Sequence, residues 1–314
     1  PVDALSRTPR SAFGWGEPAM LRQRAISSIF IVGLTLGPAM FGRTIFTALI
    51  AAILALALRE TYGMFRHAGH RPLDWAGYGA LAAFLLTAFF RGWERWGAAL
   101  ITAVVILPLL ALLARAEGRN ALADWALTVT GALYIGLPAV HFFLLRDLAG
   151  PLPSFLERVD EVGRWQYREF NQTTRGLGWY LTAQIVTWLS DTGAYAAGRR
   201  WGRRKLAPAV SPGKSVEGAL GGLVAGALVA WLCAYAFGLP LGPLQALGVG
   251  ATLSIVGQLG DLAESLLKRQ VGVKDSGTLI PGHGGVLDRI DGLLVVVVVA
   301  YYLARLLSWF GAGA

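Results

Sequence analysis

Long apolar runs recur along the whole chain and leave only short segments between them. A helix needs about 20 mostly apolar residues to cross the hydrocarbon core of a bilayer. On this measure the chain predicts nine membrane-spanning helices, at residues 25–42, 44–58, 73–90, 97–114, 123–145, 177–197, 217–238, 242–267 and 287–309. We therefore expect an all-α, polytopic integral membrane protein with about nine transmembrane helices.

The composition supports a membrane protein. Only 15% of the 314 residues are charged and 55% are hydrophobic, whereas a soluble domain carries about 25% charged residues. The net charge of +9 suits anionic partners such as nucleotides and acidic lipids. Nucleic acid is a poor fit, because the basic residues lie between apolar runs rather than together on one soluble face. The single cysteine, Cys233, excludes a disulfide framework.

The pattern of polar segments predicts three parts. Residues 1–19 are polar and rich in Pro, Gly and Arg, and we expect a disordered N-terminal extension there. Residues 20–176 hold the N-terminal transmembrane helices and end in an extracytoplasmic connection at 147–176, with a short amphipathic helix near Phe155–Phe170. Residues 177–314 form a C-terminal transmembrane region that carries most of the charged motifs.

Two basic loops set the expected orientation. Segment 199–214 carries six Lys or Arg residues and no acid, and segment 268–284 carries three against a single acid. Two spans separate these segments, so both face the same side of the membrane. The positive-inside rule makes that side the cytoplasm.

Five carboxylates lie beside the spans on this predicted cytoplasmic side: Asp191, Asp261, Glu264, Asp288 and Asp291. A single acid in such a place can form a structural ion pair with a nearby Lys or Arg. Yet a carboxylate at membrane depth costs about 2.5 kcal/mol or more on insertion scales. Five of them beside segments on one side therefore predict a shared functional site.

Carboxylates with few His and no Cys nearby favour Mg²⁺ or another hard cation. The expected ligands are Asp261 and Asp288, with Glu264 and Asp291 as further ligands and Asp191 in support. One or two such divalent ions would bridge phosphate oxygens and stabilise an in-line displacement. A monovalent cation beside them is a further alternative.

Basic and Gly-rich elements surround these acids. The turn Pro281–Gly285 lets the backbone approach a ligand closely, and the helix that follows offers free N–H groups to phosphate. The residues expected to bind substrate here are Lys268, Arg269, Lys274, His283, Gly284, Gly285 and Arg289. His283 has no His or Cys partner nearby, so zinc is a weak alternative. In the turn at 211–215 and just before it, the expected phosphate contacts are Ser211, Lys214 and Arg199.

The stretch 265–291 resembles the signature of the phosphatidate cytidylyltransferases (CDP-diacylglycerol synthases). That signature is Ser-x-apolar-Lys-Arg, four residues, Lys-Asp, then Pro-x-His-Gly-Gly, one apolar residue, x-Asp-Arg and, one residue later, Asp. Every fixed position is present with the same spacing. Residues 191–218 are similar to a second family segment, in which Gly213 and Ser215 here replace a Lys and a Thr.

The resemblance implies an enzyme of the cell's inner (plasma) membrane, and the basic loops predict that its active site faces the cytoplasm. It would convert CTP and phosphatidic acid to CDP-diacylglycerol and pyrophosphate with Mg²⁺, while the acyl chains stay among the membrane lipids. The lipid phosphate is already an anion, so charge neutralisation and alignment do most of the work. The expected catalytic residues are Asp261, Asp288, Lys274 and Asp191. The predicted spans are compatible with a homodimer.

Other functions fit part of the pattern. CTP-dependent polyprenol or phytol-type lipid kinases resemble this family at a distance, but the complete block from Lys274 to Arg289 argues against them. An ion-coupled transporter would need carboxylates near mid-membrane and usually inverted repeats. The acids here lie at span ends, and the chain shows no convincing repeat.

Overall fold

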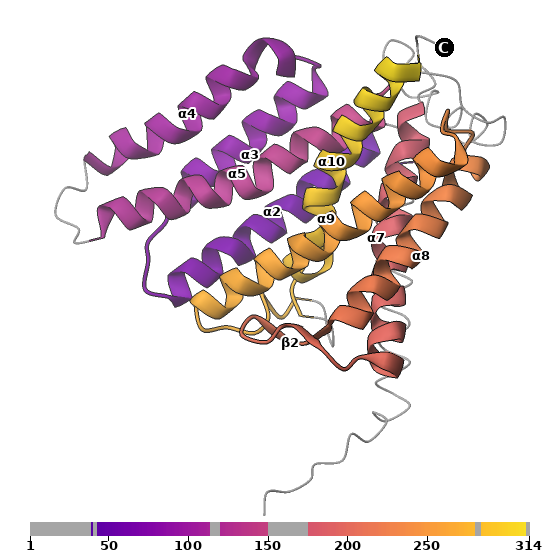
Figure 1. Ribbon diagram of the computed structural model, residues 1–314. Coiled ribbons are helices and arrows are strands. Elements are labelled where there is room, and N and C mark those ends of the chain that lie inside the picture. The colour runs from indigo at the N-terminus through magenta and orange to yellow at the C-terminus, as the bar shows by residue number, and fades with distance from the viewer. Residues whose placement is uncertain (1–38, 40–42, 114–119, 150–174, 280–283, 312–314) are drawn as a thin grey trace, which may run out of the picture.

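The computed structural model describes residue 39 and residues 43–113, 120–149, 175–279 and 284–311. Within them the chain forms α2 (Arg43–His67), α3 (Asp74–Phe89), α4 (Trp93–Leu113), α5 (Ala121–Arg146), α7 (Arg175–Trp201), β1 (Lys205–Ala207), β2 (Ser211–Ser215), α8 (Val216–Ala236), α9 (Pro243–Gln270) and α10 (Leu287–Gly311) (Figure 1). The all-α, polytopic membrane fold is confirmed.

Six of these helices are long and apolar enough to cross a membrane: α2, α4, α5, α8, α9 and α10. The expected spans at 73–90 and 177–197 fall on α3 and α7, which are not among these six. The expected span at 25–42 lies outside the described residues except for Ala39, so the total of nine stays a prediction. The extension at 1–19 and the helix near Phe155–Phe170 also lie outside them.

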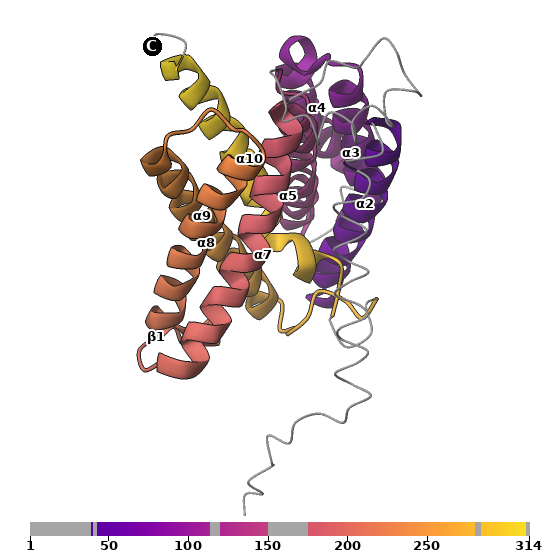
Figure 2. The same ribbon diagram turned by 90° about the vertical axis from the view of Figure 1, so that its right-hand side faces the viewer.

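The helices form two groups that meet at α10. Helices α2 to α5 pack together on one side, and α7, α8 and α9 pack together on the other (Figure 2). The last helix, α10, contacts α5 and α9, so it joins the two groups. This arrangement brings the N-terminal end of α10 beside the C-terminal ends of α2 and α9 (Figure 1).

Small residues allow α7, α8 and α9 to approach closely. A Cβ atom on Gly221 of α8 would lie 2.2 Å from that of Ala197 on α7, and one on Gly250 of α9 would lie 2.2 Å from the Gly226 carbonyl oxygen. A side-chain hydrogen bond also joins these helices, because the hydroxyls of Ser190 on α7 and Ser254 on α9 are 2.6 Å apart. Such close helix packing replaces the hydrophobic driving force that is missing within a bilayer.

This packing predicts a position-specific loss of stability along α9. Gly250→Ala is expected to lower the free energy of unfolding by about 1–3 kcal/mol, because the clashing atom is a backbone oxygen. The matched control is Gly248→Ala, where the added Cβ has no neighbour within 4 Å. Unfolding midpoints in detergent would measure both, and equal destabilisation would contradict the proposed packing.

Helix α2 continues beyond the predicted span, 44–58, to His67. The polar and charged residues after Leu58 end the apolar run but not the helix, and several of them have partners within the protein. The Tyr62 hydroxyl donates to the Thr128 carbonyl on α5 at 2.8 Å, and Arg66 pairs with Asp74. The added turns carry Glu60 toward the start of α10.

A short hairpin follows α7 and was not expected from the sequence. Strands β1 and β2 pair antiparallel, and the Glu217 carboxylate accepts hydrogen bonds from the Arg203 and Arg204 amides. The Arg269 Nε, at the end of α9, donates to the Val210 carbonyl at 3.2 Å. The two basic loops therefore meet at one end of the helix bundle, as their separation by two spans predicts.

Candidate active site

A cavity of about 1020 Å³ opens at this end of the bundle, between α7, α8, α9, α10 and the hairpin. Ligand pockets of roughly 300–1,000 Å³ are typical for small molecules, so the cavity is large enough for a nucleotide. The predicted site residues that line it are Asp191, Arg199, Ser211, Lys214, Asp261, Lys268, Asp288, Arg289 and Asp291. The structure thus brings together side chains from both polar segments of the sequence.

Lys268 joins two carboxylates in the wall of this cavity. Its ammonium contacts Glu264, one turn earlier on α9, and lies 2.6 Å from Asp288 Oδ1 on α10. The Glu264 side chain is fully buried, and the Lys268 side chain is only 10% exposed. Buried charges persist when they are paired, and the two carboxylates fix the position of the Lys268 ammonium.

The second oxygen of Asp288 organises the turn that leads into α10. Asp288 Oδ2 lies 2.7 Å from the Gly285 amide and 3.0 Å from both the amide and the hydroxyl of Ser276. Gly284 has a φ of +82°, and a Cβ there would lie 2.7 Å from the same oxygen. The turn therefore requires glycine, and both oxygens of Asp288 are engaged by protein donors.

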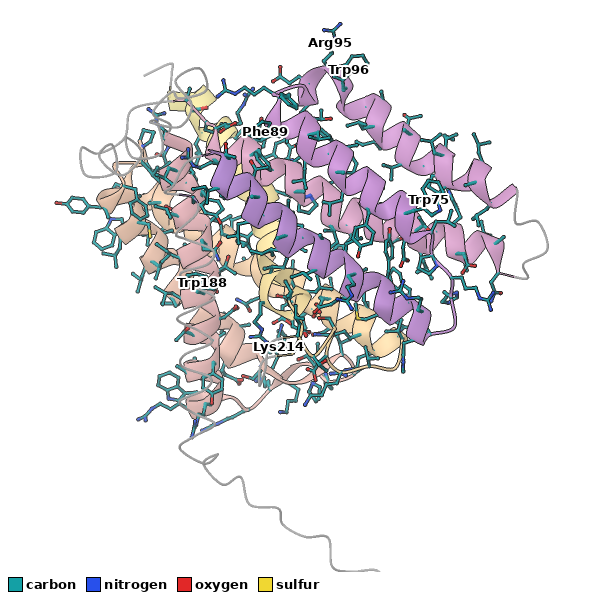
Figure 3. All side chains as sticks on the ribbon, turned by 180° about the vertical axis from the view of Figure 1, so that it is seen from behind. Trp75, Phe89, Arg95, Trp96, Trp188 and Lys214 are labelled. Atoms are coloured by element: carbon teal, nitrogen blue, oxygen red, sulfur yellow. The ribbon has the colours of Figure 1, made fainter. Side chains whose placement is uncertain are left out.

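Three further acids, Asp191, Asp261 and Asp291, reach the same cavity from α7, α9 and α10. They lie close enough to interact electrostatically with one another. Asp261 Oδ2 is 2.7 Å from the Lys214 ammonium, and 38% of the Asp261 side chain is exposed. Figure 3 shows Lys214 at this end of the bundle and Trp188 further along α7. The cavity thus holds acids and bases side by side.

These acids fit a metal ion whose remaining ligands come from the phosphates of the substrate. Among the described residues, no three His, Cys, Asp or Glu side chains form a group that could hold a metal ion by themselves. Mg²⁺, however, is usually bound by one or two carboxylates together with substrate phosphates. The oxygens of Asp191, Asp261 and Asp291 suit such a site, in which the protein supplies part of the coordination.

The remaining predicted residues lie elsewhere. Arg269 points to the hairpin and donates to the Val210 and Val273 carbonyls. Glu264 lies behind Lys268, Gly284 and Gly285 form the turn, and Lys274 is exposed and does not line the cavity. His283 lies outside the described residues. Their expected roles in binding stay predictions.

Sequence reasoning missed Glu60, whose carboxylate on α2 accepts hydrogen bonds from the amides of Val286 and Leu287 at the start of α10. A signal for it was present, because Glu60 follows an apolar run on the same predicted side as the other acids. Asp275, Tyr195 and Gln258 line the cavity and were not singled out either.

Comparison with known proteins agrees with this geometry. The model of the Cytidylyltransferase family matches residues 22–307. The chain belongs to the cytidylyltransferase family. The phosphatidate cytidylyltransferase of Bacillus subtilis (strain 168) is 32% identical over 290 residues, which cover 92% of this chain and 99% of the relative. That of Synechocystis sp. is 32% identical over 299 residues, or 92% and 98% of the two chains.

A more similar segment lies within a shorter match. The phosphatidate cytidylyltransferase of Staphylococcus haemolyticus (strain JCSC1435) is 48% identical over 122 residues, which cover 39% of this chain and 47% of the relative. The family resemblance drawn from residues 265–291 is therefore confirmed.

Proposed function

We propose that the protein is a phosphatidate cytidylyltransferase, which converts CTP and phosphatidic acid to CDP-diacylglycerol and pyrophosphate. The observation that carries this proposal is that the signature residues Lys268, Asp275, Asp288, Arg289 and Asp291 line one cavity, with Lys268 and Asp288 paired in its wall. The two relatives matched along nearly their whole length bear the same activity in their names.

The proposed reaction is a nucleotidyl transfer. An oxygen of the lipid phosphate attacks the α-phosphorus of CTP, and the bond from that phosphorus to the oxygen bridging it to the β-phosphate breaks. Because the nucleophile is already an anion, the site needs no strong general base. Lys268, held by Glu264 and Asp288, would present a fixed positive charge to the phosphates, and Lys214 and Arg289 line the same cavity. Fixed charges of this kind stabilise a transition state without reorganisation.

We propose Mg²⁺ as the cofactor, as one or two ions, with a monovalent cation as an alternative addition. Asp261, together with Asp191 and Asp291, would hold it beside the phosphates. Asp288, expected from the sequence as a ligand, would have to exchange Lys268, Ser276 or Gly285 for the ion. When bound, a divalent ion supplies charge neutralisation at the phosphoryl oxygens.

We further propose that the cavity faces the cytoplasm at the plasma membrane. The two basic loops that meet at this end support the proposal, because Lys and Arg concentrate in cytoplasmic loops. The apolar residues Leu189 and Leu293, which line the same cavity, suit a lipid whose acyl chains stay in the bilayer. A homodimer stays an open alternative.

The first test supplies purified protein with phosphatidic acid, Mg²⁺ and CTP radiolabelled in its cytosine. We expect label in the lipid extract, and we expect a chelator or Asp288→Asn to abolish it. Formation of CDP in the presence of a lipid alcohol would instead indicate the kinase. Substrate flux in proteoliposomes without CTP turnover would indicate the transporter.

A second prediction concerns Gly213, where the family segment has Lys. Gly213 lines the cavity, and a Cβ atom on it would have no neighbour within 4 Å. Gly213→Lys should therefore fit and lower the KM for CTP roughly two- to fivefold, since an exposed ion pair contributes about 1 kcal/mol or less. Gly213→Gln is the uncharged control, and an equal change in its KM would contradict a charge effect.

A further inference from the structure

Glu60 links the N-terminal helices to the turn that carries the signature residues. Its Oε1 accepts a hydrogen bond from the Val286 amide at 3.0 Å, and its Oε2 accepts one from the Leu287 amide at 2.8 Å. These two amides begin α10 and have no partners within that helix. A carboxylate from a helix more than 200 residues away in sequence thus caps the helix that bears Asp288.

Two glycines in the turn pack directly against the same carboxylate. A Cβ atom on Gly277 would lie 2.6 Å from Glu60 Oε1, and one on Gly285 would lie 2.4 Å from Oε2. Both distances are far shorter than a van der Waals contact, so the Glu60 head group leaves no room for side chains at these positions. The turn and Glu60 are therefore shaped to fit each other.

Ser276 connects Glu60 to the cavity wall. Its hydroxyl lies 3.0 Å from Glu60 Oε2 and 3.0 Å from Asp288 Oδ2, and its single proton can be donated to only one of them at a time. Asp288 in turn holds the Lys268 ammonium at 2.6 Å. A continuous chain of polar contacts therefore runs from α2, which does not line the cavity, to a charge that does.

We infer that Glu60 is a positioning residue for cytidylyl transfer, an inference that rests on the proposed function. Glu60 fixes the start of α10 and the Ser276 side chain, and these hold Asp288 and, through it, the Lys268 ammonium. A misplacement of about 1 Å in such a group can lower a rate about 10²-fold. The effect falls on the transition state more than on ground-state binding, because binding of CTP draws on several other charges.

The test compares the carboxamide variant Glu60→Gln with the carboxylate variant Glu60→Asp. Glu60→Gln keeps the shape of the side chain but turns one acceptor into a donor, which then faces a donor. We expect kcat to fall about 10- to 100-fold and the KM for CTP to change less than roughly threefold. Glu60→Asp, which keeps both acceptors, should recover part of the rate.

Asp124→Asn is the matched control. Its Oδ1 accepts from the Arg71 amide at 2.7 Å, so it also joins α5 to a segment that connects two helices, the one between α2 and α3, but Asp124 does not line the cavity. We expect a similar fall in the unfolding midpoint for both carboxamide variants and unchanged kcat for Asp124→Asn. The double variant Glu60→Gln with Ser276→Ala should lose less kcat than the product of the two single losses. The reason is that Glu60 and Ser276 act through one contact.

The inference is wrong if folded Glu60→Gln keeps kcat within about twofold of wild type, or if the double variant shows the full product of the single losses. Failure of the proposed function is distinguishable, because the wild-type protein itself would then incorporate no label into lipid. Hydrogen exchange at the Val286 and Leu287 amides gives a readout without turnover: these amides should exchange faster in Glu60→Gln, and equal exchange in the wild type would overturn the capping contact.

Discussion

Lys268→Met is expected to slow cytidylyl transfer strongly and to destabilise the fold at the same time. The substitution removes the ammonium that pairs with Glu264 and Asp288, and it leaves two carboxylates with almost no solvent contact. Breaking such a buried pair costs about 3–5 kcal/mol. Loss of a fixed charge beside the phosphates should lower kcat on the order of 10²- to 10³-fold. Label in the lipid extract and the unfolding midpoint measure the two effects.

The two effects can be separated by a second substitution. Adding Glu264→Gln to Lys268→Met removes one unpaired buried charge, so the midpoint should recover in part. The rate should stay low, because the ammonium at the cavity wall is still absent. Recovery of both stability and rate would show that Lys268 has only a structural role.

Arg269→Met is the neighbouring control. Arg269 follows Lys268 directly in the signature, but its guanidinium contacts the Val210 and Val273 carbonyls and does not line the cavity. We expect a loss of about tenfold or less, which reflects looser anchoring of the hairpin. A loss as large as that of Lys268→Met would contradict this assignment of the cavity.

Helix positions were predictable because bilayer thickness fixes the length of an apolar run. The spans expected at 217–238 and 242–267 correspond closely to α8 and α9. The expected span 44–58 ends before α2 does, because the charged residues that follow Leu58 mark the end of an apolar run but not of a helix. Pairing of that charge with partners far along the chain, such as Glu60 with Leu287, leaves no periodic pattern in the sequence.

The site was predictable in its members but only partly in their arrangement. Glu264 and Lys268 are four residues apart, so helical spacing alone places them on one face of α9, where they pair. Adjacent residues on a helix point in directions about 100° apart, which separates Arg269 from Lys268. The turn contacts of Asp288 could not be anticipated, since they depend on how Ser276 and Gly285 fold back onto it.

Asp261→Asn is expected to slow turnover strongly while leaving the fold nearly intact, in contrast to Lys268→Met. The Asp261 side chain is 38% exposed to the cavity, and its ion pair is with Lys214, which is itself 25% exposed. An exposed pair of this kind contributes about 1 kcal/mol or less to stability. Turnover should fall on the order of 10²- to 10³-fold, because a carboxylate that neutralises and aligns the phosphates with the divalent ion is lost.

A titration of rate against Mg²⁺ concentration distinguishes the proposed ligand from an ordinary charged residue. Asp261→Asn should need a higher Mg²⁺ concentration for its residual rate, and Asp191→Asn and Asp291→Asn should show the same shift to a smaller degree. Asp74→Asn is the control, because Asp74 pairs with Arg66 away from the cavity. An unchanged Mg²⁺ dependence in Asp261→Asn would remove Asp261 from the metal site. The Lys214–Asp261 pair would then be the reason that the carboxylate lies there.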